Sequence, residues 1–157
     1  MKIESIFDGI RQTRNGFIAL INSMSTEQLN LIPAGFKNNI VWNFGHLVVT
    51  TPALCYQRTG IQEDFPIPFQ NSYKKDTFPT HPIETTEIYF LRELMIHTID
   101  QLEIDYHAGV FNNGFTPYAT GTYGATLNSI EEVLMTTLMH DNLHWGYAQA
   151  QRRNIIG

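Results

Sequence analysis

Apolar residues recur every three or four positions along four stretches of the chain, the spacing that places side chains on one face of an α-helix. The stretches cover about residues 3–24, 38–60, 84–106 and 126–153. The pattern predicts four amphipathic helices, with a break and a short helical turn near residues 25–27. The apolar stripe of the first helix is formed by Ile3, Ile6, Ile10, Phe17, Leu20 and Met24.

Polar residues mark the starts of the second and fourth helices. Asn38 or Asn39 can cap the second helix, because a short polar side chain accepts a hydrogen bond from a first-turn backbone N–H. Thr126 can cap the fourth helix in the same way, with Asn128 or Ser129 as alternatives.

Proline and glycine define the breaks in the pattern. Pro52 lies inside the second helix, where its missing N–H predicts a kink rather than an end, because the apolar pattern continues beyond it. Residues 60–82 lose the helical period and contain four prolines, and residues 109–125 contain four glycines. We therefore expect two long connections, and the first fits a crossover between parallel helices.

Four helices, two long connections and no convincing strand pattern predict an all-α fold, a four-helix bundle. The 157 residues suffice for one domain with its own core, so residues 1–157 are interpreted as a single domain. Bundles of this kind build ligand and metal sites between facing helices.

Charge and composition exclude several classes of function. The net charge is −5 and there is no basic run, so nucleic acid and anionic membrane surfaces are poor partners. No apolar run approaches the ~20 residues that span a bilayer. Cys55 is the only cysteine and cannot form an internal disulfide. Together with the lack of a recognisable signal peptide, this predicts a cytoplasmic protein.

Three histidines are the strongest candidates for chemistry. His140 and His144 are four residues apart, so their imidazoles leave the same face of the fourth helix. His46 lies on the apolar stripe of the second helix, next to Gly45, whose missing side chain permits close helix contact. If these helices face one another, the three rings converge on one divalent ion.

The alternative is that these histidines are hydrogen-bonded core residues without a metal. Burying an imidazole costs free energy unless both nitrogens are satisfied, which an ion and a neighbouring acceptor can achieve. Asn43 and Asp141 are candidates for such acceptors, although each is also plausible as an ordinary polar group, and Trp42 is a candidate for the pocket wall. Each belongs to one of the two histidine-bearing helices.

The other histidines and the cysteine are interpreted as ordinary residues. His81 and His107 are expected at the surface, and Cys55 as a small core residue. His97 lies near the buried stripe of the third helix without a helical partner, and its role stays open.

Two motifs resemble the DinB and YfiT-like metal-binding helical bundles, which are unrelated to the polymerase that shares the first name. The first is Trp42-Asn43-Phe44-Gly45-His46-Leu47, and the second runs from His140 through Gly146 to the trailing pair Arg152-Arg153. The resemblance covers nearly the whole chain. One departure is Tyr147, where the family often has Gln.

The resemblance implies a metal triad of His46, His140 and His144 in a bundle that is usually a homodimer. The implied cofactor is one divalent ion, zinc or nickel, with iron as an alternative. The implied partners are a small-molecule substrate and a low-molecular-weight thiol cosubstrate.

Two functions follow from a three-histidine site. The first is a metal-dependent enzyme, either a thiol transferase or a hydrolase with a metal-activated water, because three protein ligands leave a coordination position open. In both, Trp42 and the loop at residues 109–125 would line or cover the pocket. Thiol transfer is preferred, since no obvious Glu or Asp general base accompanies the triad on its own helix. The second is a non-catalytic metal-binding or ligand-sensing domain, which a fourth ligand from His97 or an acidic residue would favour.

Overall fold

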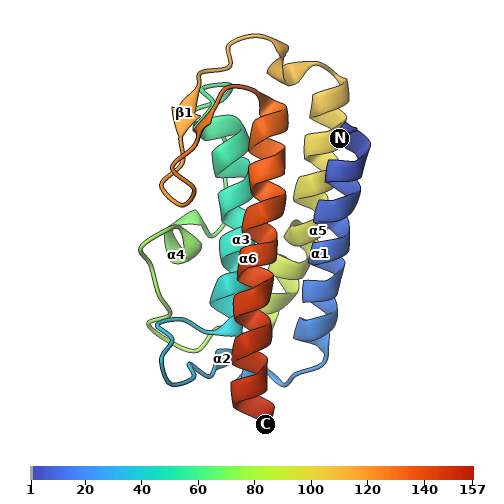
Figure 1. The fold of residues 1–157 in the computed structure, drawn as a ribbon. Helices are drawn as coiled ribbons and strands as arrows, with labels where there is room; N and C mark the ends of the chain where they lie inside the picture. Colours follow the sequence, from blue (N-terminus) through green and yellow to red (C-terminus); the bar gives the residue numbers. More distant parts are fainter. Residues whose placement is uncertain (1) are drawn as a thin grey trace.

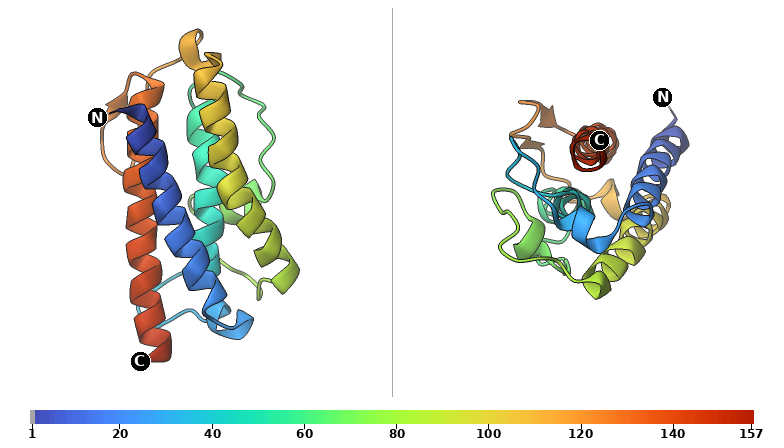
Figure 2. Two further views of the ribbon diagram at one scale, coloured as in Figure 1. Left: turned by 90° about the vertical axis from the view of Figure 1, so that its right-hand side faces the viewer. Right: turned by 90° about the horizontal axis from the view of Figure 1, so that it is seen from below.

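The computed structural model describes residues 2–157 and shows four long helices side by side (Figure 1). They are α1 (Ile3–Asn22), α3 (Ile40–Pro52), α5 (Thr85–His107) and α6 (Ile130–Ile156). Both α1 and α3 pack against both α5 and α6, so the helices occupy the corners of a square when the bundle is seen end-on (Figure 2). The predicted four-helix bundle is confirmed.

Helices α3 and α5 run in one direction, and α1 and α6 run in the other (Figure 1). The chain between α3 and α5 therefore returns along the length of the bundle, as predicted for parallel neighbours. This connection contains a short helix, α4 (Gln70–Tyr73), which the sequence pattern did not predict. Four residues make barely one turn, so α4 carries no apolar period that could have indicated it.

The first predicted helix ends where its stripe meets polar residues. α1 ends at Asn22, and Ser25 then caps the short helix α2 (Thr26–Asn30). The Ser25 hydroxyl accepts from the Gln28 N–H while the Gln28 side chain accepts from the Ser25 N–H, a reciprocal capping box. The predicted break and short turn are confirmed.

Helix α3 starts as expected but ends differently. Asn39 caps it, and its side-chain oxygen accepts the Trp42 N–H at 2.8 Å. At Pro52 the α-helix gives way to a π turn, η1 (Ala53–Gln57), in which the Arg58 N–H reaches the carbonyl of Ala53 five residues back. The predicted kink is thus a local widening of the helix. Proline supplies no N–H to the regular ladder, and the wider turn keeps the chain helical beyond it.

The second long connection contains small elements of its own. A 3-10 turn, η2 (Val110–Asn112), is followed by two antiparallel two-residue strands, β1 (Tyr118–Ala119) and β2 (Thr126–Leu127). The expectation of no strands was wrong here, because two residues are too few to show alternation. Thr126 belongs to β2 and does not cap α6. Ser129, one of the alternatives, does so through its hydroxyl and the Glu132 N–H.

Two apolar clusters fill the interior and follow one another along the bundle. On α1 the first cluster includes Phe17 and the second includes Ile10, and Arg14 lies between them with no exposed surface. The core is therefore divided by a buried polar layer. Across residues 2–157, none of the helices combines the length and the apolar character needed to cross a membrane.

Candidate metal centre

His46, His140 and His144 lie close together in the structure. His46 lies in the middle of α3, and the other two lie on the facing helix α6. One ring nitrogen from each residue lies within 4.8 Å of the others. The ring centroids are 4.5 to 5.2 Å apart, so the rings form a compact triangle between the two helices.

The hydrogen-bond partner of His46 comes from the connection between α3 and α5. The His46 Nδ1 lies 2.6 Å from the backbone oxygen of Tyr73, at the end of α4. A carbonyl oxygen can only accept, so Nδ1 carries the proton and Nε2 keeps a lone pair, which faces the Thr50 hydroxyl at 3.3 Å. The side chain of His46 is buried with 6% of its surface exposed, and the Trp42 ring stacks on the imidazole with centroids 4.7 Å apart.

A glycine makes this arrangement possible. A Cβ atom built on Gly45 would lie 2.5 Å from the ring of Tyr73, so only glycine lets α4 approach α3 this closely. The Tyr73 hydroxyl donates to the Glu87 carboxylate on α5 at 2.5 Å, which fixes the other end of the side chain. The close helix contact expected at Gly45 is therefore a contact with α4.

The hydrogen bond of His144 is set by Asn43 on α3. His144 Nδ1 lies 2.8 Å from the side-chain oxygen of Asn43. The Asn43 amide nitrogen donates to the Asn39 backbone oxygen and to the Gln151 side-chain oxygen, which assigns the acceptor role to the Asn43 oxygen. His144 Nδ1 is therefore the donor. Its Nε2 is left with a lone pair, as in His46.

All three imidazoles are neutral near pH 7. Burial lowers the pKa of His46, and the hydrogen bond to Tyr73 opposes that decrease only in part. Burial, together with the neighbouring His46 and Arg14, lowers the pKa of His140 to about 4. Burial and the two other histidines lower the pKa of His144 to about 2. A neutral imidazole is the form that binds a metal ion.

These donors fit a divalent ion. Ligand nitrogens around tetrahedral zinc, each about 2.1 Å from the metal, are about 3.4 Å apart. Side-chain rotations that move the three nitrogens by roughly an ångström therefore bring them onto one ion. Within residues 2–157, no cysteine, aspartate or glutamate joins the cluster. His97 lies exposed on α5 and does not belong to it. The fourth protein ligand that would favour a structural role is therefore not supplied by His97 or by an acidic residue.

A cavity of about 690 Å³ opens next to the three imidazoles. Trp42 forms part of its wall, as expected, and so does the tip of the second long connection at residues 120–123. Tyr147, at the position where the resemblance was incomplete, also lines the cavity and is half exposed. The histidine cluster is therefore open to a ligand of small-molecule size.

A comparison with protein families identifies this arrangement. Residues 10–148 match the model of the DinB superfamily. The chain belongs to the DinB superfamily. The matched residues include both histidine motifs, so the DinB match and the candidate metal centre lie on the same part of the chain. No curated protein matches the chain.

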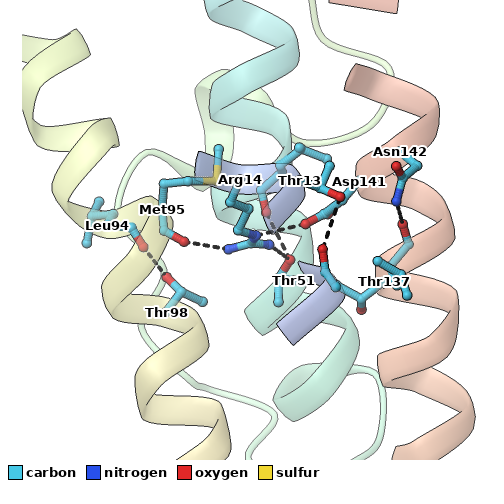
Figure 3. Close-up of polar contacts among 12 residues, drawn as sticks. Thr13, Arg14, Thr51, Leu94, Met95, Thr98, Thr137, Asp141 and Asn142 are labelled. Carbon is cyan, nitrogen blue, oxygen red and sulfur yellow. Dashed lines mark hydrogen bonds and ion pairs between the residues drawn. The ribbon is translucent and has the colours of Figure 1, made fainter. Parts of the chain in front are cut away.

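In the core of this DinB domain, Arg14 connects all four long helices (Figure 3). From α1, its guanidinium donates to the Asp141 carboxylate at 2.8 Å, the Met95 carbonyl at 2.7 Å and the Thr51 hydroxyl at 2.5 Å. Asp141, a candidate either for the partner of a ligating imidazole or for an ordinary polar group, points into this buried layer. Neighbouring residues on a helix differ in direction by about 100°, which separates Asp141 from His140.

The remaining candidates lie outside the site. Cys55 is fully buried, and burial raises the pKa of its thiol to about 12, so it is an unreactive core residue at neutral pH. His81 and His107 are exposed, as expected for surface residues.

The sequence analysis did not indicate Arg14, Tyr73 or the basic residues that line the cavity, which are Lys37, Arg58, Lys74 and Lys75. A signal for the first was present, since Arg14 lies between Ile10 and Phe17 on an apolar stripe and a buried arginine requires a buried acceptor. The sequence carried no such signal for Tyr73 or for the basic residues, because the position of a backbone carbonyl and the lining of a cavity depend on how distant segments pack.

Proposed function

We propose that this DinB-superfamily protein is a metal-dependent enzyme that uses a low-molecular-weight thiol in a transferase-like reaction. In this proposal, His46, His140 and His144 hold one divalent ion, zinc or nickel, with iron as the alternative. The observation that carries it is the set of three neutral imidazoles beside an open cavity, without a fourth protein ligand from His97 or an acidic group. Three protein ligands and an open position are typical of catalytic metal sites.

The residues around the cavity have separate tasks. Tyr73 and Asn43 hold two of the imidazoles in the tautomer whose Nε2 is unprotonated, and Trp42 excludes water from one face of His46. When bound, a divalent ion supplies Lewis acidity, which favours the ionised form of a thiol or of water. In the transfer, the thiol sulfur forms a bond to an electrophilic carbon, the leaving group departs with its bonding electrons, and the thiol proton passes to solvent.

The acidic groups favour a thiol over water as the nucleophile. Among the described residues, Asp76 contributes the one carboxyl group that lines the cavity, and it is exposed. Asp141, next to a candidate ligand in sequence, is held by Arg14 in the core. A site without a positioned carboxylate base suits a thiol, because a thiol ionises far more easily than water. Hydrolysis and ligand sensing are the alternatives.

The test compares reactions on metal-loaded protein. The panel contains small thiols with an epoxide or activated aryl halide, and ester and amide substrates without a thiol. We expect thiol-dependent product formation that His144→Ala abolishes and that His97→Ala, which alters an exposed histidine outside the cluster, leaves unchanged.

Each alternative has its own result. Ester or amide cleavage without a thiol would replace the proposal with the hydrolase. A metal-loaded protein that turns over neither class of substrate would favour the sensing role. Thiol transfer that persists at the wild-type rate in His144→Ala would remove the histidine cluster from the mechanism.

A further inference from the structure

The basic residues of the chain are concentrated at the cavity. The protein has 10 Lys and Arg residues against 15 Asp and Glu residues, yet the cavity is lined by four basic residues and one acidic residue. We call the four basic residues the cationic rim. They are exposed residues of a cavity wall, so they lie at its mouth: Lys37, Arg58, Lys74 and Lys75.

The rim is assembled from three separate segments. Lys37 precedes α3, Arg58 follows η1, and Lys74 and Lys75 follow α4. Helix α4 is the element that also delivers the Tyr73 carbonyl to His46, so part of the rim and the metal centre are positioned by the same contact.

The positive charge of the rim is not compensated by the protein. Within residues 2–157, carboxylates pair with Arg11 and Arg14 but with none of the four rim residues. The contacts that Arg58 and Lys74 make are with neutral groups. Arg58 donates to the Ala119 carbonyl and lies 4.7 Å from the Tyr118 ring centroid, and Lys74 donates to the Asn71 side-chain oxygen.

Uncompensated cations at the mouth of a cavity attract and retain anions. The three imidazoles add no negative charge, because they are neutral, and the cavity wall also includes apolar Val49 and Leu54. One cavity therefore combines metal-binding nitrogens, apolar surface and exposed positive charge.

We propose that the ligand of this cavity is a small organic anion whose carboxylate binds the cationic rim while its other end reaches the histidines. This inference rests on the proposed function, since it specifies the thiol or its co-substrate as carboxylate-bearing. The carboxylate accepts hydrogen bonds from the rim ammonium and guanidinium groups, which are stronger than hydrogen bonds to neutral donors.

The experiment measures binding instead of turnover. Protein loaded with cobalt(II), a coloured substitute for zinc, is titrated with ω-mercaptocarboxylates and with the matching ω-mercaptoalcohols of equal chain length. The thiolate-to-cobalt absorption band reports binding at the histidines. In parallel, metal-free protein is titrated with the corresponding alkanoates and alkanols, and binding is followed by tryptophan fluorescence, since Trp42 lines the cavity.

We expect the carboxylates to bind at least about tenfold more tightly than the alcohols at low salt, and the preference to shrink as salt rises. The variant Lys37→Gln/Lys74→Gln/Lys75→Gln should lose most of this preference and bind the alcohols as wild type does. Lys2→Gln is the matched control, because Lys2 is the one lysine outside the rim. It should leave both affinities unchanged.

The outcomes separate this inference from the proposed function. Equal binding of carboxylates and alcohols, with or without metal, would overturn the anionic ligand even if thiols bind the cobalt. A protein that takes up no cobalt but still prefers alkanoates, through the rim lysines, would retain the anion site and overturn the metal-dependent function. A preference that survives in the triple variant would show that the rim does not cause it.

Discussion

At the scale of single residues, two hydrogen bonds determine which imidazole nitrogens are available to a metal ion. The Tyr73 backbone oxygen accepts a hydrogen bond from the Nδ1–H of His46, and the Asn43 side-chain oxygen accepts one from the Nδ1–H of His144. Partners of this kind orient a ligand and raise its basicity, so their removal weakens metal binding without touching a ligating atom.

Asn43→Ala tests this role. We expect a metal dissociation constant about 10 to 100 times higher than that of wild type, because His144 loses the acceptor that fixes its tautomer. Competition with a chromophoric chelator measures the affinity, and circular dichroism verifies that the variant is folded. Asn142→Ala is the control, since Asn142 is exposed and, among the residues that the structure describes, its side chain bonds only to the Leu138 carbonyl of its own helix. Equal affinity of Asn43→Ala and wild type would contradict the assigned role.

The sequence indicated the three histidines because their spacing follows from helix geometry. It also indicated Asn43 and Trp42, which lie about one turn or less from His46 on the same helix. It did not indicate Tyr73, since the contributing atom is a backbone oxygen that any residue possesses. It left the role of Asp141 open between an imidazole partner and an ordinary polar group, and it did not indicate the ion pair with Arg14, because that partner comes from a distant helix.

At the scale of elements, the short helix α4 links the bundle to the site. It packs on α3 at Gly45, and its last residue supplies the acceptor for His46. The long helices follow from their apolar stripes, which span several turns. The one-turn helix α4, the two-residue strands and the π turn after Pro52 leave no comparable period. They depend on tertiary contacts and on the missing proline N–H.

Gly45→Ala should disturb this link. The added methyl group would lie 2.5 Å from the Tyr73 ring, so α4 must shift. We expect a loss of about 1 to 3 kcal/mol in the free energy of unfolding, as for other overpacked sites, together with weaker metal binding. Urea unfolding and chelator competition measure the two effects.

Gly146→Ala provides the matched comparison for that variant. Gly146 lies inside α6, and a Cβ atom added there would meet open space, with nothing within 4 Å. Alanine therefore meets no clash, and helix propensity alone should stabilise this variant by about 0.5 to 1 kcal/mol. If Gly45→Ala behaved like Gly146→Ala, the close approach of α4 would have no energetic importance.

At the scale of the whole molecule, a single guanidinium joins four helices in the layer that separates the two apolar clusters. The four-helix arrangement was predictable from the stripes and connections. The polar layer was missed, because the stripes of α1 and α6 were interpreted as apolar despite Arg14 and Asp141. The homodimer implied by the family resemblance stays a prediction.

Arg14→Met should be severely destabilising. It leaves the Asp141 carboxylate buried without its cation, which costs about 3 to 5 kcal/mol in comparable buried pairs. The double variant Arg14→Met/Asp141→Leu should recover part of that loss, since no charge is then left unpaired. Arg11→Met breaks partly exposed pairs with Asp100 and Glu103 and should change the stability by no more than about 1 kcal/mol. A double variant less stable than Arg14→Met would contradict this account.

The stability of the metal-free protein should depend on pH through the buried histidines. In the folded state their pKa values are lowered from the ordinary value of 6.5, and that of His140 is lowered to about 4. Below pH 6.5, the unfolded chain therefore binds protons more tightly than the folded protein does. The free energy of unfolding should therefore be level above pH 6.5. It should fall toward pH 4, by up to about 1.4 kcal/mol per pH unit for each histidine. Urea midpoints across this range measure the slope, and His140→Gln should reduce it. A slope unchanged in that variant would exclude His140 as a cause.

The central claim is that one divalent ion is held by rings from α3 and α6. The most direct measurement is the metal content, by mass spectrometry, of protein purified without a histidine tag. The account predicts about one equivalent of a divalent transition metal, as for other three-histidine centres, retained in His97→Ala and lost in His46→Ala, His140→Ala and His144→Ala. Less than about a tenth of an equivalent in the wild-type protein after incubation with zinc, nickel or iron(II) would contradict it, because a site of this type binds such ions tightly.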